Sequence, residues 1–152
     1  MDLKNIIRTI PNYPIDGVLF RDITTVLKDK EALRKSVDEI TKSLEKIEFD
    51  YVLGPESRGF IFAMPIAYNM NKGFIPVRKA GKLPAETISK EYDLEYGSAV
   101  LEIHKDAIKK GDKVIIVDDL LATGGTCKAI IELVESIGAE VVSLNFFNDL
   151  EE

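Results

Sequence analysis

The sequence predicts a single α/β domain in which helices flank a mainly parallel β-sheet. Residues 114–117 form an unbroken apolar run of mostly β-branched residues, as in a strand buried on both faces. Apolar residues then recur at helical spacing from position 129 to position 137, and a second apolar run occupies 141–147. This strand–helix–strand unit of about 30 residues has the length of a parallel crossover. A chain of 152 residues fits one domain, 1–152, with a substantial core.

The link between this strand and helix carries the most informative residues. Asp118 and Asp119 end the strand, and residues 122–126, Ala-Thr-Gly-Gly-Thr, are small enough for backbone N–H groups to turn toward one point. The first N–H groups of the helix are unpaired and its dipole is positive there, which favours an anion by about 0.3–1 kcal/mol. Carboxylates beside an anion cradle fit a ligand with both hydroxyls and a phosphate, such as a sugar phosphate.

A simpler interpretation is that the two acids only solvate a strand end and that Gly124-Gly125 is only a tight turn. The combination of strand, acids, small-residue loop and helix favours a ligand site over that interpretation. The loop lacks the GxxxxGK[ST] pattern of P-loop NTPases and the GxGxxG pattern of dinucleotide-binding folds, so both classes are disfavoured.

The N-terminal third of the chain predicts two helices. Apolar residues at positions 3, 6, 7 and 10 have helical spacing, so a short amphipathic helix is expected to end at Pro11. Asp29 is the expected N-cap of a second helix, whose apolar stripe runs from residue 33 to residue 47.

The middle of the chain predicts alternating strands and helices. The expected elements are strands at 51–53, 74–77 and 99–103, a loop at 54–59 and a helix at 60–70. Pro65 should make that helix irregular, and Gly73 should follow its end. A basic segment containing Gly and Pro runs to about Ser89, and such a segment can move to cover an anionic ligand. The strand at 99–103 should form a hairpin with the end of this segment.

Composition excludes several classes of protein. The net charge of −6 disfavours non-specific binding to nucleic acid or to acidic membrane surfaces. One cysteine and one histidine, His104, cannot form a Cys/His metal site within one chain, and His104 is expected to be structural. The N-terminus lacks the apolar core of a signal peptide and no run approaches 18 apolar residues, so a cytoplasmic protein is expected.

Five motifs together resemble one known family. Residues 114–126, VIIVDDLLATGGT, resemble the phosphoribosyl-pyrophosphate (PRPP) binding motif of type I phosphoribosyltransferases, in the form found in members that act on adenine. Further segments resemble the same enzymes in the same order, and the resemblance covers about residues 10–145: GVLFRDIT at 17–24, GPESRGF at 54–60, RKAGKLP at 78–84 and LEYG at 94–97. It implies the type I phosphoribosyltransferase fold with a short N-terminal hood that binds the base.

The resemblance implies an activity: transfer of the phosphoribosyl group of PRPP to adenine, giving AMP and pyrophosphate in purine salvage. Asp118 and Asp119 would hold the ribose hydroxyls. The implied PRPP-binding residues are Asp118, Asp119, Ala122, Thr123, Gly124, Gly125, Thr126, Arg58, Arg78 and Lys82. Arg58, Lys82 and Glu95 are the implied catalytic residues, with Glu95 handling the purine proton. Without the resemblance, Arg58 is equally well explained by a surface pair with Glu56, and 78–82 by a solvated basic loop.

The resemblance also implies how adenine, magnesium and a second subunit are bound. Phe20 would stack on the purine. Without the resemblance, Phe20 is better explained as a core residue. Backbone groups of Val18 and Arg21 would bind the edge of the base. Magnesium would be carried mainly by PRPP and pyrophosphate, with no protein side chain assigned to it. The expected partners are small molecules and a second copy of the chain, a homodimer, with no nucleic acid or membrane.

Two alternatives stay open at this point. One is a phosphoribosyltransferase for another purine base. The other is a PRPP-sensing regulator that binds without chemistry, against which the presence of Arg58, Lys82 and Glu95 argues, together with the lack of a DNA-binding segment.

The C-terminus departs from the family pattern. Members that act on adenine usually continue past residue 147 with a Gly-Arg-containing turn and a further strand, whereas this sequence ends at Glu152. PRPP and magnesium binding should survive this shortening. Purine binding should be weaker or less selective, unless a partner subunit compensates.

Overall fold

The computed structural model describes residues 8–11, 19–22, 24–56, 58–93, 97–118 and 125–146, with positions 8–11, 19–22, 58 and 125 described by their backbone alone. In chain order the elements are β1 (Arg8–Pro11), β2 (Leu19–Asp22), α1 (Thr24–Lys28), α2 (Lys30–Leu44), β3 (Tyr51–Pro55), α3 (Arg58–Met70), β4 (Gly73–Lys79), β5 (Thr87–Asp93), β6 (Ser98–His104), β7 (Lys113–Asp118), α4 (Gly125–Ile137) and β8 (Glu140–Phe146).

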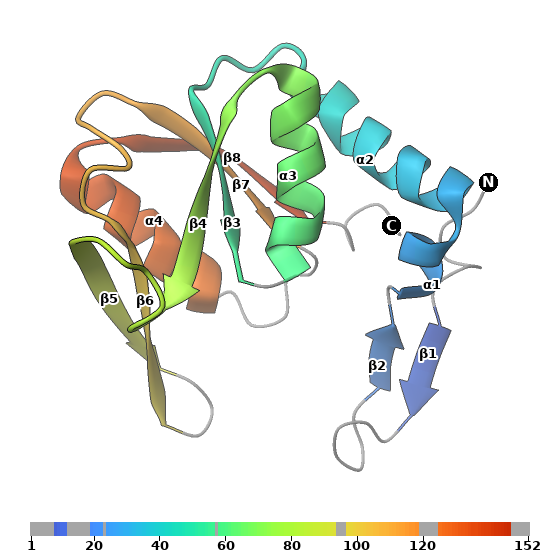
Figure 1. Cartoon of the computed structure of the whole chain (residues 1–152), viewed down its shortest axis with the longest axis horizontal. Helices are drawn as coiled ribbons and strands as arrows, with labels where there is room; N and C mark the ends of the chain where they lie inside the picture. The colour runs from blue at the N-terminus through green and yellow to red at the C-terminus, as the bar shows by residue number, and fades with distance from the viewer. Residues whose placement is uncertain are drawn as a thin grey trace.

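Six strands form one mixed sheet in the order β5-β6-β4-β3-β7-β8. β3 pairs in parallel with β4 and β7, and β7 pairs in parallel with β8. The hairpin of β5 and β6 adds two antiparallel pairings, one within the hairpin and one to β4. The predicted α/β architecture, crossover and hairpin are therefore confirmed. The carboxyl ends of β3, β4 and β7 point to the same edge of the sheet (Figure 1).

Helices cover both faces of this sheet, with α2 and α3 on one face and α4 on the other (Figure 1). β7 shows why both faces must be covered. Its side chains alternate: Ile115 and Val117 pack in the cluster with α2 and α3, whereas Val114 and Ile116 pack in the cluster with α4. All four are fully buried, so the strand that precedes the predicted ligand loop is fixed by two cores at once.

The predicted N-terminal helix is wrong for its last residues, because 8–11 form strand β1. β1 pairs with β2 in antiparallel register, with Ile10 opposite Phe20. A two-turn helix is marginal by itself, and Thr9 and Ile10 are β-branched, so pairing with a distant strand outweighs the local periodicity. The two strands form a separate sheet beside α1, clear of α4 (Figure 1).

The ends of the two long central helices follow from capping chemistry. Asp29 caps α2 as predicted: its Oδ1 accepts hydrogen bonds from the N–H groups of Glu31 and Ala32, each at 3.0 Å. α3 includes Pro65 and ends before Asn71, which adopts φ 57°. The sequence assigned that stop to Gly73, but Asn tolerates the left-handed conformation and Gly73 instead begins β4.

Candidate active site

The link from β7 to α4 brings a carboxylate and a helix N-terminus to the carboxyl edge of the sheet. β7 ends at Asp118 and α4 begins at Gly125, with half-buried Thr126 in its first turn. The strand–helix unit that the sequence predicted is therefore present. The predicted ligands Asp119, Ala122, Thr123 and Gly124 lie outside the described residues, and their roles stay predictions.

Gly59 brings the start of α3 against the end of β7. A Cβ atom at Gly59 would lie 2.7 Å from Cδ of Pro55, 3.1 Å from the carbonyl oxygen of Val117 and 3.2 Å from Oδ1 of Asp118. Only glycine permits this approach without a shift of the neighbouring atoms. The start of α3, which follows the predicted pyrophosphate loop, therefore lies against the end of β7, which precedes the predicted ribose-phosphate loop.

The thiol of Cys127, in the first turn of α4, has a raised pKa. The thiol is buried, and burial raises its pKa to about 11, with a further contribution from the negative charge of Asp118. The thiol is thus neutral at physiological pH.

The cationic side of the site lies at the end of β4. Arg78 is the penultimate residue of the strand, and its Nη2 lies 3.5 Å from Oε2 of Glu56, which follows β3. The alternative pairing predicted from sequence joined Glu56 to Arg58; Glu56 pairs with Arg78, and the side chain of Arg58 lies outside the described residues. Lys82 is exposed in the following turn, and its charge helps to lower the pKa of Glu56.

The turn that carries Lys82 is held against β6. Glu102 accepts a hydrogen bond from the N–H of Gly81 through Oε1 (2.9 Å) and one from the hydroxyl of Thr87 through Oε2 (2.9 Å). Nε2 of His104 accepts the N–H of Ala85 (3.3 Å), which agrees with its predicted structural role. The basic segment predicted to reach about Ser89 is shorter, because β5 begins at Thr87.

Glu56 and Glu102 organise the site but carry no signal for this role in the sequence. Both act across strands that only the tertiary pairing brings together, so neither carries a signal in its local sequence. Glu102 fits the ordinary alternation of polar and apolar residues along β6. The sequence suggested for Glu56 only a surface pair with Arg58.

The predicted base-binding residues are described only in part. Phe20 and Arg21 belong to β2, opposite Ile10 and Thr9 of β1. Their side chains, together with Val18 and the predicted proton-handling residue Glu95, lie outside what the structure describes.

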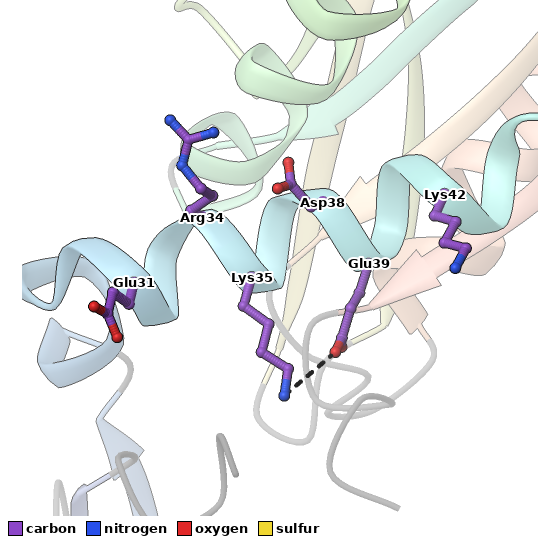
Figure 2. A pocket seen from close by; sticks show the side chains of 6 residues that line it. All are labelled: Glu31, Arg34, Lys35, Asp38, Glu39 and Lys42. Carbon is purple, nitrogen blue, oxygen red and sulfur yellow. Dashed lines mark ion pairs between the residues drawn. The ribbon is translucent and has the colours of Figure 1, made fainter. Parts of the chain in front are cut away.

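Elsewhere in the described residues, neither the surface of α2 nor a side-chain cluster forms a second site. A shallow hollow on the outer face of α2 is lined entirely by charged side chains of that helix, and Lys35 and Glu39 pair across one turn at 3.8 Å (Figure 2). It contains none of the predicted site residues and is explained by solvated i,i+4 charges. Within the described ranges, no group of three His, Cys, Asp or Glu side chains could hold a metal ion.

The fold, with the start of α3 against the end of β7, defines a class, the phosphoribosyl transferase domain, whose family model matches residues 24–147. An adenine phosphoribosyltransferase of Clostridium novyi is 61% identical over 150 residues, which cover 99% of this chain and 87% of that protein. The chain belongs to the adenine phosphoribosyltransferase family, whose members are pentosyl-transferring enzymes.

Solved structures give the same result. The adenine phosphoribosyltransferase of Thermoanaerobacter pseudethanolicus superposes with a TM-score of 0.91 at 56% identity, covering 94% of this chain and 83% of that one. The Saccharomyces cerevisiae enzyme has a TM-score of 0.89 at 42% identity, covering 95% and 84%. That structure contains adenine and D-2,5-dideoxy-2,5-imino-altritol 1,6-bisphosphate, a doubly phosphorylated sugar analogue.

Proposed function

We propose that this protein transfers the phosphoribosyl group of PRPP to adenine, giving AMP and pyrophosphate in purine salvage. The observation that carries the proposal is the near-complete match to adenine phosphoribosyltransferases, 61% identical across 99% of the chain. In the reaction, the bond between the anomeric carbon and the pyrophosphate oxygen breaks, and a bond from that carbon to a purine ring nitrogen forms. Positive charge develops on the ribose while negative charge grows on the leaving group, so electrostatic stabilisation dominates catalysis.

The ribose 5-phosphate end of PRPP binds at the link between β7 and α4. Residues 122–126 bind the 5-phosphate mainly through backbone N–H groups, since small residues at a helix start permit this contact. Asp118 and Asp119 hold the ribose hydroxyls and lie beside the developing positive charge. This arrangement is supported by the position of Asp118 at the end of β7, the strand that precedes α4.

Cations on the neighbouring strands bind the pyrophosphate. Arg58 at the start of α3 and Arg78 at the end of β4 present guanidinium groups, which suit bidentate pairing with phosphate oxygens. Lys82 joins them when its turn moves over the ligand. Each such preorganised contact is worth roughly 10²–10³ in rate. The close packing of Gly59, at the start of α3, against Asp118, at the end of β7, supports this assignment.

Magnesium is proposed as an ion carried by the substrate. The described residues near the site include the carboxylate of Asp118 and form no three-ligand cluster, and magnesium is commonly held by one or two carboxylates with substrate phosphates and water. When bound in this way, the ion would shield the charge of the pyrophosphate group.

The base lies on the β1–β2 side. Phe20 stacks on adenine, and backbone groups of Val18 and Arg21 read its edge. Glu95 accepts the proton that the purine nitrogen loses as it bonds to the ribose. The antiparallel pairing of β1 and β2 supports the hood role, because it holds the backbone around residue 20 in an extended conformation beside β1.

A homodimer is proposed as the working form. Ile61, Met64 and Tyr68 lie at i, i+3 and i+7 along α3 and form an apolar stripe that is 41%, 52% and 87% exposed. Such a stripe on the helix that begins at the pyrophosphate loop suits a second copy of the chain. The proposed compartment is the cytoplasm, because PRPP is highly charged and does not cross membranes; none of the described helices is long and apolar enough to cross one.

An activity screen tests the proposal. Purified protein is incubated with PRPP, magnesium and, in turn, adenine, hypoxanthine, guanine and xanthine, and nucleotide formation is measured. AMP formation well above the other products is the expected result. Preference for another base would make the protein a different phosphoribosyltransferase, and PRPP binding without any nucleotide would favour the sensing protein.

A further inference from the structure

Glu56 connects the two cationic loops of the site. One residue separates it from the start of α3, and its backbone N–H donates to the carbonyl oxygen of Val77 (2.9 Å). Its Oε1 accepts the backbone N–H of Lys79 (2.7 Å), and its Oε2 lies 3.5 Å from Nη2 of Arg78. A single residue after β3 therefore contacts three consecutive residues at the end of β4.

The charge of Glu56 is retained at neutral pH. The hydrogen bond from the Lys79 amide holds the pKa of this carboxyl below its usual value, assisted by Arg78 and Lys82 and opposed by burial. The side chain is only 14% exposed, and its two oxygens contact the Lys79 amide and the Arg78 guanidinium at the same time.

These contacts restrict the groups that face the pyrophosphate. An arginine side chain loses much rotamer freedom when it binds a ligand, and restraint in the free protein removes part of that cost from binding. The pair with Glu56 restrains the guanidinium of Arg78, and Nε of Arg78 is buried without a hydrogen-bond partner among the described residues. The bond to the Lys79 amide also fixes the start of the turn, where the N–H of Lys82 donates to the carbonyl oxygen of Lys79 (3.3 Å).

We infer that Glu56 is a positioning residue of the pyrophosphate subsite. It holds Arg78, and Lys79 at the start of the Lys82 turn, in the geometry that binds pyrophosphate. The inference rests on the proposed function, because pyrophosphate is the ligand of that subsite. Electrostatics alone gives the opposite expectation: a carboxylate beside an anion site repels the anion, so its removal would tighten binding. The two accounts therefore differ in the sign of one measurable effect.

Three variants separate these accounts. Glu56→Ala removes both contacts, Glu56→Asp keeps the charge but shortens the reach, and Glu56→Gln loses the charge but keeps an oxygen that can accept from Lys79. Magnesium pyrophosphate binding is measured by calorimetry, and KM for PRPP and for adenine by steady-state kinetics. We expect Glu56→Ala and Glu56→Asp to weaken pyrophosphate binding and raise the KM for PRPP by roughly 10–100-fold. The KM for adenine should change less than about 2-fold, and Glu56→Gln should stay within about 3-fold of wild type.

The control is Glu86→Ala, which removes an exposed carboxylate that pairs with Lys105 at 3.3 Å beyond the Lys82 turn and should leave all three values unchanged. Tighter pyrophosphate binding by Glu56→Ala, or unchanged binding by both Glu56→Ala and Glu56→Asp, overturns the inference. If Glu56→Ala does not fold, the contrast between Glu56→Asp and Glu56→Gln decides alone. Wild-type protein that binds pyrophosphate but forms no AMP contradicts the proposed function instead, and the effect of Glu56 on pyrophosphate binding can still be measured.

Discussion

Single residues of the site differ in how firmly the fold holds them. Arg78 is tied to Glu56 at the end of β4, whereas Lys82 is exposed in the turn beyond it. A lysine in such a turn suits a contact that forms only during the chemical step, when the turn closes over the pyrophosphate.

Lys82→Ala should therefore lower turnover by roughly 10²–10³ while changing adenine affinity by less than about 2-fold. Steady-state kinetics and calorimetry with adenine measure the two effects. Lys105→Ala, at an exposed lysine after β6, is the matched control. Equal losses in turnover and adenine affinity would show a general binding or folding role.

The neutral thiol of Cys127 gives a second prediction at this scale. Its pKa of about 11, against 9.0 for an ordinary thiol, leaves about 100-fold less thiolate in the native state near pH 8. Native protein should react with a disulfide reagent at least about 100-fold more slowly than unfolded protein. Because the folded state keeps the proton that the unfolded state loses, stability should also fall as pH rises from about 9 toward 11. Rapid labelling of native protein at pH 8 would contradict the buried position.

Among the elements, α3 packs closely against the end of β7 at Gly59. Gly59→Ala would place a Cβ 2.7 Å from Cδ of Pro55 and 3.2 Å from Oδ1 of Asp118, so the start of α3 must shift relative to the ends of β3 and β7. We expect a loss of about 1–3 kcal/mol in unfolding free energy and weaker PRPP binding, because Asp118 moves.

Gly73→Ala is the control for this prediction. Gly73 is the first residue of β4, far along the strand from the site, and a Cβ there would lie 3.2 Å from the ring of Tyr51. The substitution should therefore lower stability without changing PRPP affinity. Denaturant unfolding and calorimetry distinguish the two variants. PRPP affinity unchanged in Gly59→Ala would show that the contact does not position the site.

Elements with strong local patterns could be predicted from sequence, and elements defined by distant pairing could not. The sequence predicted β7, α4 and β8 from the apolar run at 114–117 and the pattern that follows it. A strand buried on both faces has an unbroken apolar run, whereas a helix buried on one face has apolar residues every three or four positions, so the two are easily distinguished. Strand β1 depends on its pairing with β2, so its four residues looked helical. Glu102 likewise acts only once β6 lies beside the Lys82 turn.

The candidate site follows the same division. Asp118 and Arg78 could be placed from sequence because strand ends are predictable and parallel strands present their carboxyl ends at one edge. The approach of Gly59 to Asp118 could not, because it depends on how α3 packs against β7. The family resemblance supplied the chemistry of these residues, which periodicity alone does not contain.

The whole molecule is expected to work as a pair of chains joined through the apolar stripe of α3. Met64→Glu places a charge in the middle of that stripe and should shift the protein toward monomers in sedimentation velocity. Lys42→Glu, which also introduces an acid on an exposed helix surface, should leave the association unchanged. A monomeric wild type, or a Met64→Glu protein that sediments as a dimer, would contradict this interface.

PRPP binding at the start of α4 is the central claim, and calorimetry of wild type and Gly124→Val with PRPP and magnesium tests it most directly. The valine side chain would block the backbone approach of the 5-phosphate, so affinity should fall by at least about 100-fold, while circular dichroism shows an intact fold. Unchanged PRPP affinity in Gly124→Val would contradict the account.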